Sequence, residues 1–237
     1  MKPMRILALS CPAKGAAAAV LSDGEVLATF SAGDAMTGSE LLLPMAEAAL
    51  RSAGITTSDV DLFAVTAGPG SFTGVRIGVA LVKGLAFGRG AVCCGVSTLE
   101  ALAENVVPLA GLVCPVMDAR RGEVYAALFR SADGKVVRLL PDGALPAAEL
   151  AAVVARDYPG EPVMLVGDGV SVASPVFRDA GITLAPLPDV LLPHSAVSCG
   201  RVALRAAMAG QAVDADALAP VYLRECQAES NRRFVGK

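Results

Sequence analysis

The residues of this chain that could do chemistry gather in one glycine-rich stretch, positions 68–78, which reads GPGSFTGVRIG. An apolar run of strand composition precedes it at 62–66, and a helix-length apolar segment follows it. In a strand–turn–helix order, the free N–H groups and the positive dipole end of the helix can hold an anion. The sequence therefore predicts a turn that contacts phosphate, and the residues that would form it are Gly68, Gly70, Ser71 and Gly74.

The same turn has a second, purely structural interpretation. A Walker-type phosphate loop needs Lys and then Ser or Thr after its last glycine, but Val75 follows Gly74 here. A dinucleotide-binding fingerprint that starts at Gly68 would need glycine where Thr73 stands. Both known loops are excluded, so a phosphate-contacting turn and a tight structural turn stay open as equal alternatives. In either case we expect Ser71 or Thr73 to cap the helix.

The helix after the turn carries glycines at a regular spacing. Gly74 and Gly78 are four residues apart, as are Gly84 and Gly88, and residues four apart share a helix face. Each glycine costs a helix about 1 kcal/mol relative to alanine, so close approach of another backbone is the expected reason. That backbone belongs either to the protein's own sheet or to a helix of a partner chain.

Two further residues could take part in chemistry. Asp118 follows an apolar run at 112–117 and is either a second phosphate contact or a turn residue that accepts backbone N–H bonds. His194 is the only histidine, and we expect it in a loop before a helix, because a metal site needs more ligands around it. No Gly-x-Ser-x-Gly nucleophile motif is present. We therefore predict neither a catalytic residue nor a metal site.

Composition limits the class of protein. The chain has 237 residues, of which 54% are hydrophobic and 18% are charged, which is enough for one large domain or two lobes. No apolar run reaches the roughly 18 residues of a transmembrane helix, and the first residues do not resemble a signal peptide. The formal net charge of −3 and 4% aromatic content argue against a main RNA-binding surface. A small basic tail contains Arg232, Arg233 and Lys237.

The six cysteines are interpreted as free thiols in a reducing cytoplasm rather than as disulfides. None of them form the closely spaced pair that is typical of a metal site. Cys93 and Cys94 are adjacent in a predicted strand, so their side chains should point to opposite faces of the sheet.

The order of predicted elements occurs twice along the chain. Strands are expected at 5–9, 16–21, 26–30, 62–66 and 91–96, with helices at 40–53, 73–87 and 99–105. In the second half, strands are expected at 112–117, 123–130, 136–140, 163–166 and 182–185, with helices at 146–156, 171–180 and 195–209. Three strands, a helix, a strand and a helix predict an α/β fold with a mixed sheet and flanking helices in each half. We expect lobes at 1–107 and 108–237, with the last helix packing back on the first lobe.

Five motifs together resemble the TsaB (YeaZ) family, in the family's order along the chain. They read SELLLP at 39–44, GPGSFTGVRIG at 68–78, GVSTLEALA at 95–103, DARRGEVY at 118–125 and PVYLR at 220–224. The resemblance implies the two-lobed architecture of actin, sugar kinases and Hsp70, in which ligands lie in the cleft between the lobes. Members of the family are non-catalytic partner subunits in the bacterial synthesis of threonylcarbamoyladenosine in tRNA.

The resemblance implies that this chain is not an enzyme on its own. It would bind and activate a TsaD-type catalytic subunit, with a TsaE-type ATPase as a further partner, and would contact tRNA only indirectly. A homodimer through the same helices would compete with that complex. No cofactor would be tightly bound, and nucleotide would bind only at the complex interface. The expected interface residues are Ser39, Glu40, Leu43, Glu47, Phe72, Thr73, Arg76, Ile77, Val79 and Ala80.

This chain departs from the family pattern at two places. Positions 10–12 read Ser-Cys-Pro where the family more often has Asp-Thr-Ser, which removes a carboxylate that serves phosphate or metal in this architecture. Gly38 stands where a histidine usually precedes the Ser-Glu pair. Two alternatives remain: an independent Mg-ATP-dependent kinase-like enzyme, and a glycoprotease-like peptidase. The peptidase is less well supported, because catalytic relatives carry paired histidines and His194 has no second histidine.

Overall fold

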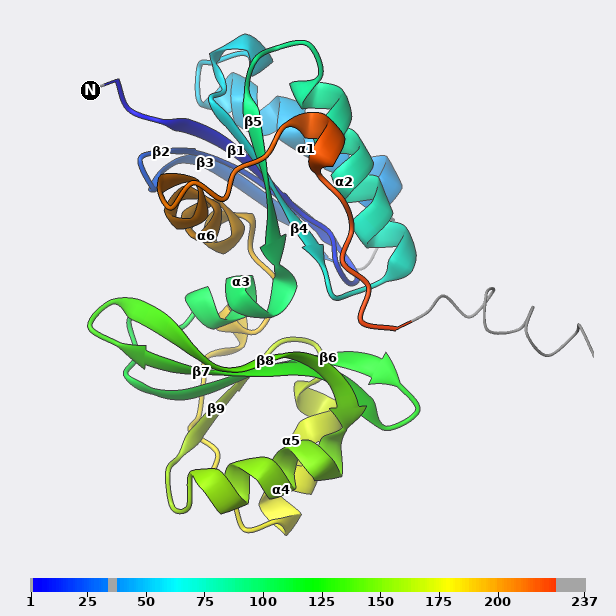
Figure 1. Ribbon diagram of the computed structural model, residues 1–237, viewed down its shortest axis with the longest axis vertical. Coiled ribbons are helices and arrows are strands. Elements are labelled where there is room, and N and C mark those ends of the chain that lie inside the picture. The colour runs from blue at the N-terminus through cyan, green and yellow to red at the C-terminus, as the bar shows by residue number, and fades with distance from the viewer. Residues whose placement is uncertain (1, 34–37, 225–237) are drawn as a thin grey trace, which may run out of the picture.

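Two sheets, one in each lobe, organise the computed structural model, which describes residues 2–33 and 38–224 (Figure 1). The first sheet has the strand order β3-β2-β1-β4-β5. β1 pairs in antiparallel fashion with β2 and in parallel fashion with β4, so the sheet is mixed. Its strands are β1 (Arg5–Ser10), β2 (Ala16–Ser22), β3 (Glu25–Ala32), β4 (Leu62–Gly68) and β5 (Val92–Ser97).

Helices cover both faces of the first sheet. α1 (Gly38–Ser52) and α2 (Phe72–Ala86) pack on one face, and α6 (Ala196–Met208) returns from the end of the chain to cover the other. Successive side chains along each strand point to opposite faces of the sheet, so a separate core forms on each face. Cys93 lies in the core below α1 and α2, and Cys94 lies in the core below α6, so the prediction of opposite faces is confirmed.

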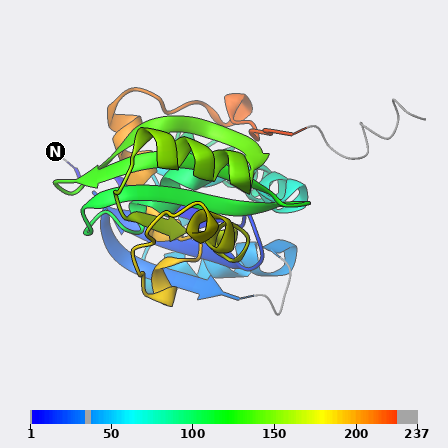
Figure 2. The same ribbon diagram turned by 90° about the horizontal axis from the view of Figure 1, so that it is seen from below.

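The second lobe repeats the arrangement with the strand order β8-β7-β6-β9. Its strands are β6 (Gly111–Arg120), β7 (Glu123–Ala132), β8 (Lys135–Pro146) and β9 (Val163–Val166). Its outer face is covered by α4 (Ala147–Asp157) and α5 (Val170–Asp179), which lie in front of the sheet in Figure 2. Short 3-10 helices η1, η2 and η3 span Thr57–Asp59, Asp189–Leu191 and Ala215–Ala217. The predicted fold class, with a mixed sheet and flanking helices in each lobe, is confirmed.

One short helix, α3 (Thr98–Glu104), lies between the two lobes (Figure 1). Ala101 packs toward the first sheet in the core below α6. Leu99 and Leu102 pack with Val113 and Phe129 of the second sheet. A single helix therefore contributes to both cores and holds the lobes together.

Three details differ from the sequence-based expectations. β8 continues to Pro146 rather than ending at 140, because after an irregularity near Leu128 its residues from Gly143 to Pro146 pair with β7 again. Residues 182–185 form no strand and contribute a single bridge between Leu184 and Val163. α1 begins at Gly38 rather than at the expected residue 40. Of the two cap residues expected for α2, Ser71 forms the cap.

The last described segment, residues 213–224, runs back across the first lobe toward the second, and we call it the C-terminal strap (Figure 1). It starts beside β5, where Val213 and Cys93 exchange backbone hydrogen bonds of 2.7 and 2.8 Å. It ends at Arg224, whose guanidinium donates to the Ala119 carbonyl of β6 at 2.8 Å. The strap therefore contacts both lobes. The predicted basic tail at Arg232, Arg233 and Lys237 lies outside the described residues.

The five described cysteines are buried and free, in line with the sequence analysis, and Cys226 lies outside the described residues. Burial raises the pKa of the Cys114 thiol to about 12 and that of Cys11 to about 11, so both stay protonated near neutral pH. None of the helices in the described part of the chain could span a lipid bilayer.

Candidate functional site

The glycine-rich turn between β4 and α2 packs against other backbone segments of the same chain. Gly68 has a φ of +126°, and a Cβ there would lie 2.1 Å from the Val221 carbonyl oxygen of the strap. A Cβ at Gly70 would lie 2.4 Å from the carbonyl oxygen of Pro12, which also accepts a hydrogen bond from Ser71 N at 2.6 Å. Glycine is required at both positions because a neighbouring backbone occupies the space of a side chain.

Two of the N–H donors of this turn, those of Ser71 and Gly74, are already used within the protein. Ser71 Oγ caps α2 by accepting a hydrogen bond from Gly74 N at 3.4 Å, as expected from the sequence. A Cβ at Gly74 would lie 2.1 Å from the carbonyl oxygen of Cys11, so a second carbonyl faces the turn. Carbonyl oxygens repel an anion, and two of the N–H groups are occupied. The geometry favours the structural turn over the phosphate-contacting one.

Asp118 likewise has the environment of a turn residue. Its Oδ1 accepts a hydrogen bond from Arg120 N at 2.7 Å, and its Oδ2 lies 3.3 Å from the Arg120 guanidinium. Arg120 and Arg121 have φ values of +70° and +57°, which form the tight hairpin between β6 and β7. The carboxylate therefore stabilises this hairpin.

Contacts within the same chain explain the spacing of Gly74 and Gly78 in α2. Gly78 is buried, and a Cβ there would lie 3.0 Å from Val65 Cγ2. Gly78 thus packs on β4 and Gly74 on the turn after β1, so the alternative in which a partner backbone lies against Gly74 and Gly78 is wrong. Gly84 is exposed, and a Cβ added there would meet no atom within 4 Å, whereas Gly88 lies after the helix end.

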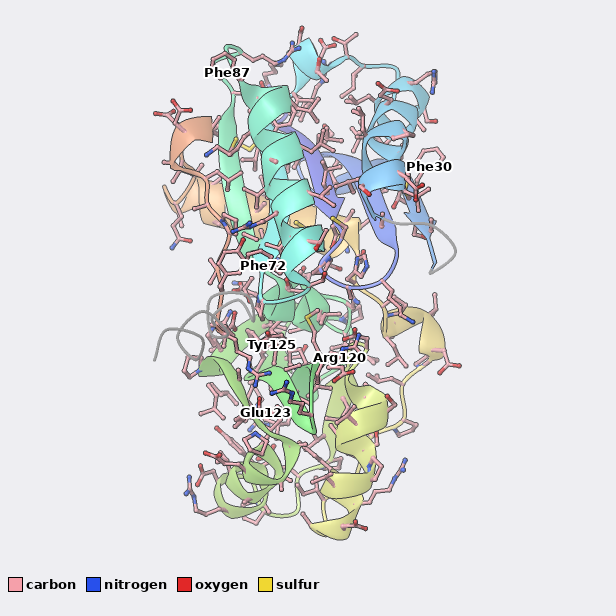
Figure 3. All side chains as sticks on the ribbon, turned by 90° about the vertical axis from the view of Figure 1, so that its right-hand side faces the viewer. Phe30, Phe72, Phe87, Arg120, Glu123 and Tyr125 are labelled. Atoms are coloured by element: carbon pink, nitrogen blue, oxygen red, sulfur yellow. The ribbon has the colours of Figure 1, made fainter. Side chains whose placement is uncertain are left out.

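The outward side chains of α1 and α2 lie on the same side of the first lobe, and we call them the α1–α2 outer face (Figure 3). Nine of the ten expected interface residues are exposed or half-buried: Ser39, Glu40, Leu43, Glu47, Phe72, Thr73, Arg76, Ile77 and Ala80. Val79 is the exception, since it is 3% exposed in the core beneath α2. Its expected place in an interface is therefore corrected, because a partner could not reach it without opening the helix.

The α1–α2 outer face combines apolar, small and charged side chains. Leu43 is 42% exposed, although the preceding Leu42 is buried. Ala80 and Gly84 of α2 are exposed and small, which leaves room for another helix to approach. Glu47 gives the α1 side a negative charge, and Arg76 gives the α2 side a positive one. The face therefore offers apolar contact, close approach and both signs of charge.

A cleft of about 650 Å³ lies between the lobes. Its walls come from the β1–β2 turn, from α3, from one side of α5 between Val170 and Arg178, and from residues 192–194. Among the described residues that line the cleft, Asp168 is the only carboxylate. Burial raises the pKa of Asp168, although its Oδ1 accepts a hydrogen bond from Asp118 N at 3.4 Å. The volume is within the range of small-molecule pockets, but only one acidic group is available for chemistry.

A second polar group at the cleft is the pair of Ser10 and His194. Ser10 Oγ lies 3.0 Å from His194 Nδ1 and 3.2 Å from Thr66 Oγ1, and His194 Nε2 lies 3.2 Å from the Lys14 carbonyl oxygen. Ser10 is completely buried, so its hydroxyl cannot reach a substrate in the cleft. The pair holds β1 to the segment before α6. His194 lies in the loop before the Ser195 cap as expected, but sequence reasoning missed its partner, which no local signal could reveal.

The described part of the chain contains no set of side chains that could ligate a metal ion. Across residues 2–33 and 38–224, no three His, Cys, Asp or Glu side chains come together as a metal ion would require. The side chains of His194 and Asp168 both line the cleft, but no third ligand joins them there.

The fold and these sites define a class: a two-lobed α/β protein with a mixed sheet in each lobe and an exposed face on α1 and α2. A model of the family described as "TsaD: tRNA N6-adenosine threonylcarbamoyltransferase" matches residues 36–231. The chain is 30% identical to "tRNA threonylcarbamoyladenosine biosynthesis protein TsaB" of Bacillus subtilis (strain 168), over 96% of this chain and 97% of that protein. It is 32% identical to the protein of the same name in Escherichia coli (strain K12), over 93% and 95% of the two chains.

A solved structure agrees with these sequence matches. The structure described as "YeaZ from Pseudomonas aeruginosa" has a TM-score of 0.78 and 29% sequence identity, covering 93% of this chain and all of that chain. This chain belongs to the TsaB (YeaZ) family.

Proposed function

We propose that this protein takes part in the synthesis of threonylcarbamoyladenosine in tRNA, as the non-catalytic subunit that binds and activates a TsaD-type transferase in the cytoplasm. The catalytic subunit would transfer the threonylcarbamoyl group to the N6 atom of the adenosine. Family membership supports this, since relatives that match almost the whole chain are named for this biosynthesis. The single observation that carries the docking role is the α1–α2 outer face, with Leu43 exposed between small and charged neighbours.

The packing of helices explains how this face could bind a partner. Two helices of each subunit can form a bundle when small residues let their axes approach closely. Ala80 and Gly84 supply such positions on α2, and Leu43 supplies an apolar side chain on α1. Leu43 is 42% exposed, so burying the rest of its side chain stabilises a contact by about half of the roughly 1.5–3 kcal/mol of a fully exposed leucine. The same face could pair with a second copy of the chain, so homodimer and heterodimer would compete.

The absence of catalysis by the chain itself is part of the proposal. Ser10 supplies no carboxylate where this architecture usually has one, and its hydroxyl is buried against His194. We propose that no cofactor is tightly bound, that nucleotide binds only at the complex interface, and that a TsaE-type ATPase joins the complex. Transfer RNA would be reached through the catalytic subunit.

A pair of alanine substitutions tests the docking face. Ala80→Arg places a long charged side chain on α2, and the matched control Ala152→Arg does so on exposed α4 of the second lobe. Mixed with the TsaD-type subunit of the same organism, wild type and Ala152→Arg should co-elute with it in gel filtration. Ala80→Arg should not co-elute with the subunit, although the midpoint of its unfolding should match that of wild type. Binding by Ala80→Arg as tight as wild type would show that another surface docks.

A kinase-like enzyme remains the second candidate, because the cleft of about 650 Å³ is large enough for a small molecule. Because Asp168 is the only carboxylate that the described part of the chain places in the cleft, we expect no binding of Mg-ATP by the isolated chain in calorimetry. Saturable binding with turnover would favour the kinase. For the peptidase, elemental analysis of the purified protein would have to reveal a stoichiometric metal.

A further inference from the structure

Three aromatic and basic side chains form an ordered stack at the start of α2. The Phe72 and Tyr222 rings are stacked with centroids 4.9 Å apart, although Tyr222 comes from the C-terminal strap. The Arg76 guanidinium carbon lies 3.8 Å from the centre of the Phe72 ring. Arg76 Nε also donates a hydrogen bond to the Tyr222 hydroxyl at 2.8 Å. Phe72 therefore supports the plane of the guanidinium, and Tyr222 fixes its orientation.

Tyr222 is itself held on both sides. Just before it, Val221 N donates a backbone hydrogen bond to the Ala67 carbonyl oxygen at 2.7 Å. Just after it, Arg224 donates to the Ala119 carbonyl oxygen and pairs with the Glu123 carboxylate of the second lobe. Because neighbours on either side fix the backbone, the tyrosine can hold Arg76 without first being ordered by a partner.

Arg76 is left with binding capacity. It is exposed, and no carboxylate in the described part of the chain lies within ion-pair distance of it. Its hydrogen bond to Tyr222 uses Nε alone, so the two terminal nitrogens form no hydrogen bond with the described residues. A planar guanidinium with two parallel N–H groups matches a carboxylate in a bidentate pair.

We propose that Arg76, oriented by Phe72 and Tyr222, anchors a carboxylate of the TsaD-type catalytic subunit, so that the C-terminal strap is part of the docking surface. This inference rests on the proposed function. Arg76 lies one helical turn before Ala80 on α2, and Phe72, the platform of the stack, lies at the start of the same helix (Figure 3). Arg76 also makes the α2 side of the interface basic, whereas Glu47 makes the α1 side acidic.

Tyr222 is a positioning residue in this account, and Phe72 is the platform beneath the arginine. Tyr222→Phe keeps the ring and removes only the hydroxyl that holds Nε, so it separates orientation from packing. Arg76→Lys keeps the charge but loses the planar fork. Arg76 and Tyr222 are both exposed, so these substitutions should leave the stability of the fold unchanged. A change in binding would therefore report on the contact itself.

Titration calorimetry of the full chain with the catalytic subunit tests the inference. Arg76→Ala and Arg76→Lys should each weaken binding about tenfold or more, and Tyr222→Phe should weaken it about threefold. The matched control Arg156→Ala removes an exposed arginine of α4 and should bind like wild type. Raising the salt concentration from about 0.05 to 0.5 M should weaken wild type more than Arg76→Ala, because salt screens the charge pair.

A charge exchange identifies the partner atom. Each surface Asp or Glu on the docking face of the catalytic subunit is changed in turn to Arg, and the variant that loses wild-type binding should regain it with Arg76→Glu. Binding of Arg76→Ala within twofold of wild type, while Ala80→Arg still prevents the complex, would overturn this inference and leave the proposed function intact. If wild type itself forms no complex, the proposed function fails. If Arg76→Ala weakens self-association of this chain but leaves binding of the catalytic subunit unchanged, the occupant is a second copy and the inference is wrong.

Discussion

Ser10 Oγ and His194 Nδ1 lie 3.0 Å apart, although 184 positions separate them in the sequence. His194 Nε2 lies 3.2 Å from the Lys14 carbonyl oxygen, so both ring nitrogens have a partner. Donation from Nε2 to the carbonyl leaves Nδ1 to accept from the serine hydroxyl, which is an arrangement of the neutral ring. Burial accordingly lowers the pKa of His194. The pair holds the end of β1 to the segment that leads into α6.

Acidification should destabilise the protein through this histidine. In the unfolded chain, histidine takes up a proton near pH 6.5, whereas the folded His194, with its lowered pKa, stays neutral to lower pH. The unfolded state then binds more protons, so the free energy of unfolding falls as the pH drops from about 7.5 to about 5.5. Urea unfolding at both pH values should show a smaller fall for His194→Gln than for wild type. An equal fall in both proteins would show that other groups cause the dependence.

The glycines of α2 should differ sharply in their tolerance of alanine. Gly74→Ala would place a Cβ 2.1 Å from a backbone oxygen of Cys11, and we expect a loss of about 2 kcal/mol or more. Gly84→Ala meets no atom within 4 Å on an exposed helix surface, and we expect a gain of about 0.5–1 kcal/mol. Chemical denaturation of the two variants measures both. Similar effects at Gly74 and Gly84 would contradict the close contact of α2 with its own sheet.

Glu104 and Arg205 form the ion pair that joins α3 to α6. The Glu104 side chain is only 5% exposed, and the Arg205 terminal nitrogens donate to its carboxylate at 3.0 and 2.6 Å. Arg205→Met leaves a buried charge unpaired and should cost about 3 kcal/mol of unfolding free energy. The double variant with Glu104→Met should recover most of this loss. A single-variant cost below about 1 kcal/mol would mean that water already neutralises the carboxylate.

The sequence predicted features that depend on local pattern. The repeated order of strands and helices follows from hydrophobic runs and turn residues, and the Ser71 cap follows from its place before an apolar helix. Contacts between residues that lie far apart in the sequence could not be predicted from local pattern. The spacing of Gly74 and Gly78 indicated a close contact, but only the position of Cys11 and Val65 shows that the contact is internal. Tyr222 belongs to a predicted motif, yet nothing local indicated that it orders Arg76.

The most direct test of the central claim is the formation of threonylcarbamoyladenosine in unmodified tRNA by a reconstituted system. The TsaD-type subunit, a TsaE-type ATPase and the threonylcarbamoyl adenylate are supplied with wild type, with Ala80→Arg, or without this protein. The account predicts product with wild type, a loss of most product with Ala80→Arg, and background when the protein is omitted. Equal product in its absence, or product from this protein without the catalytic subunit, would contradict the account.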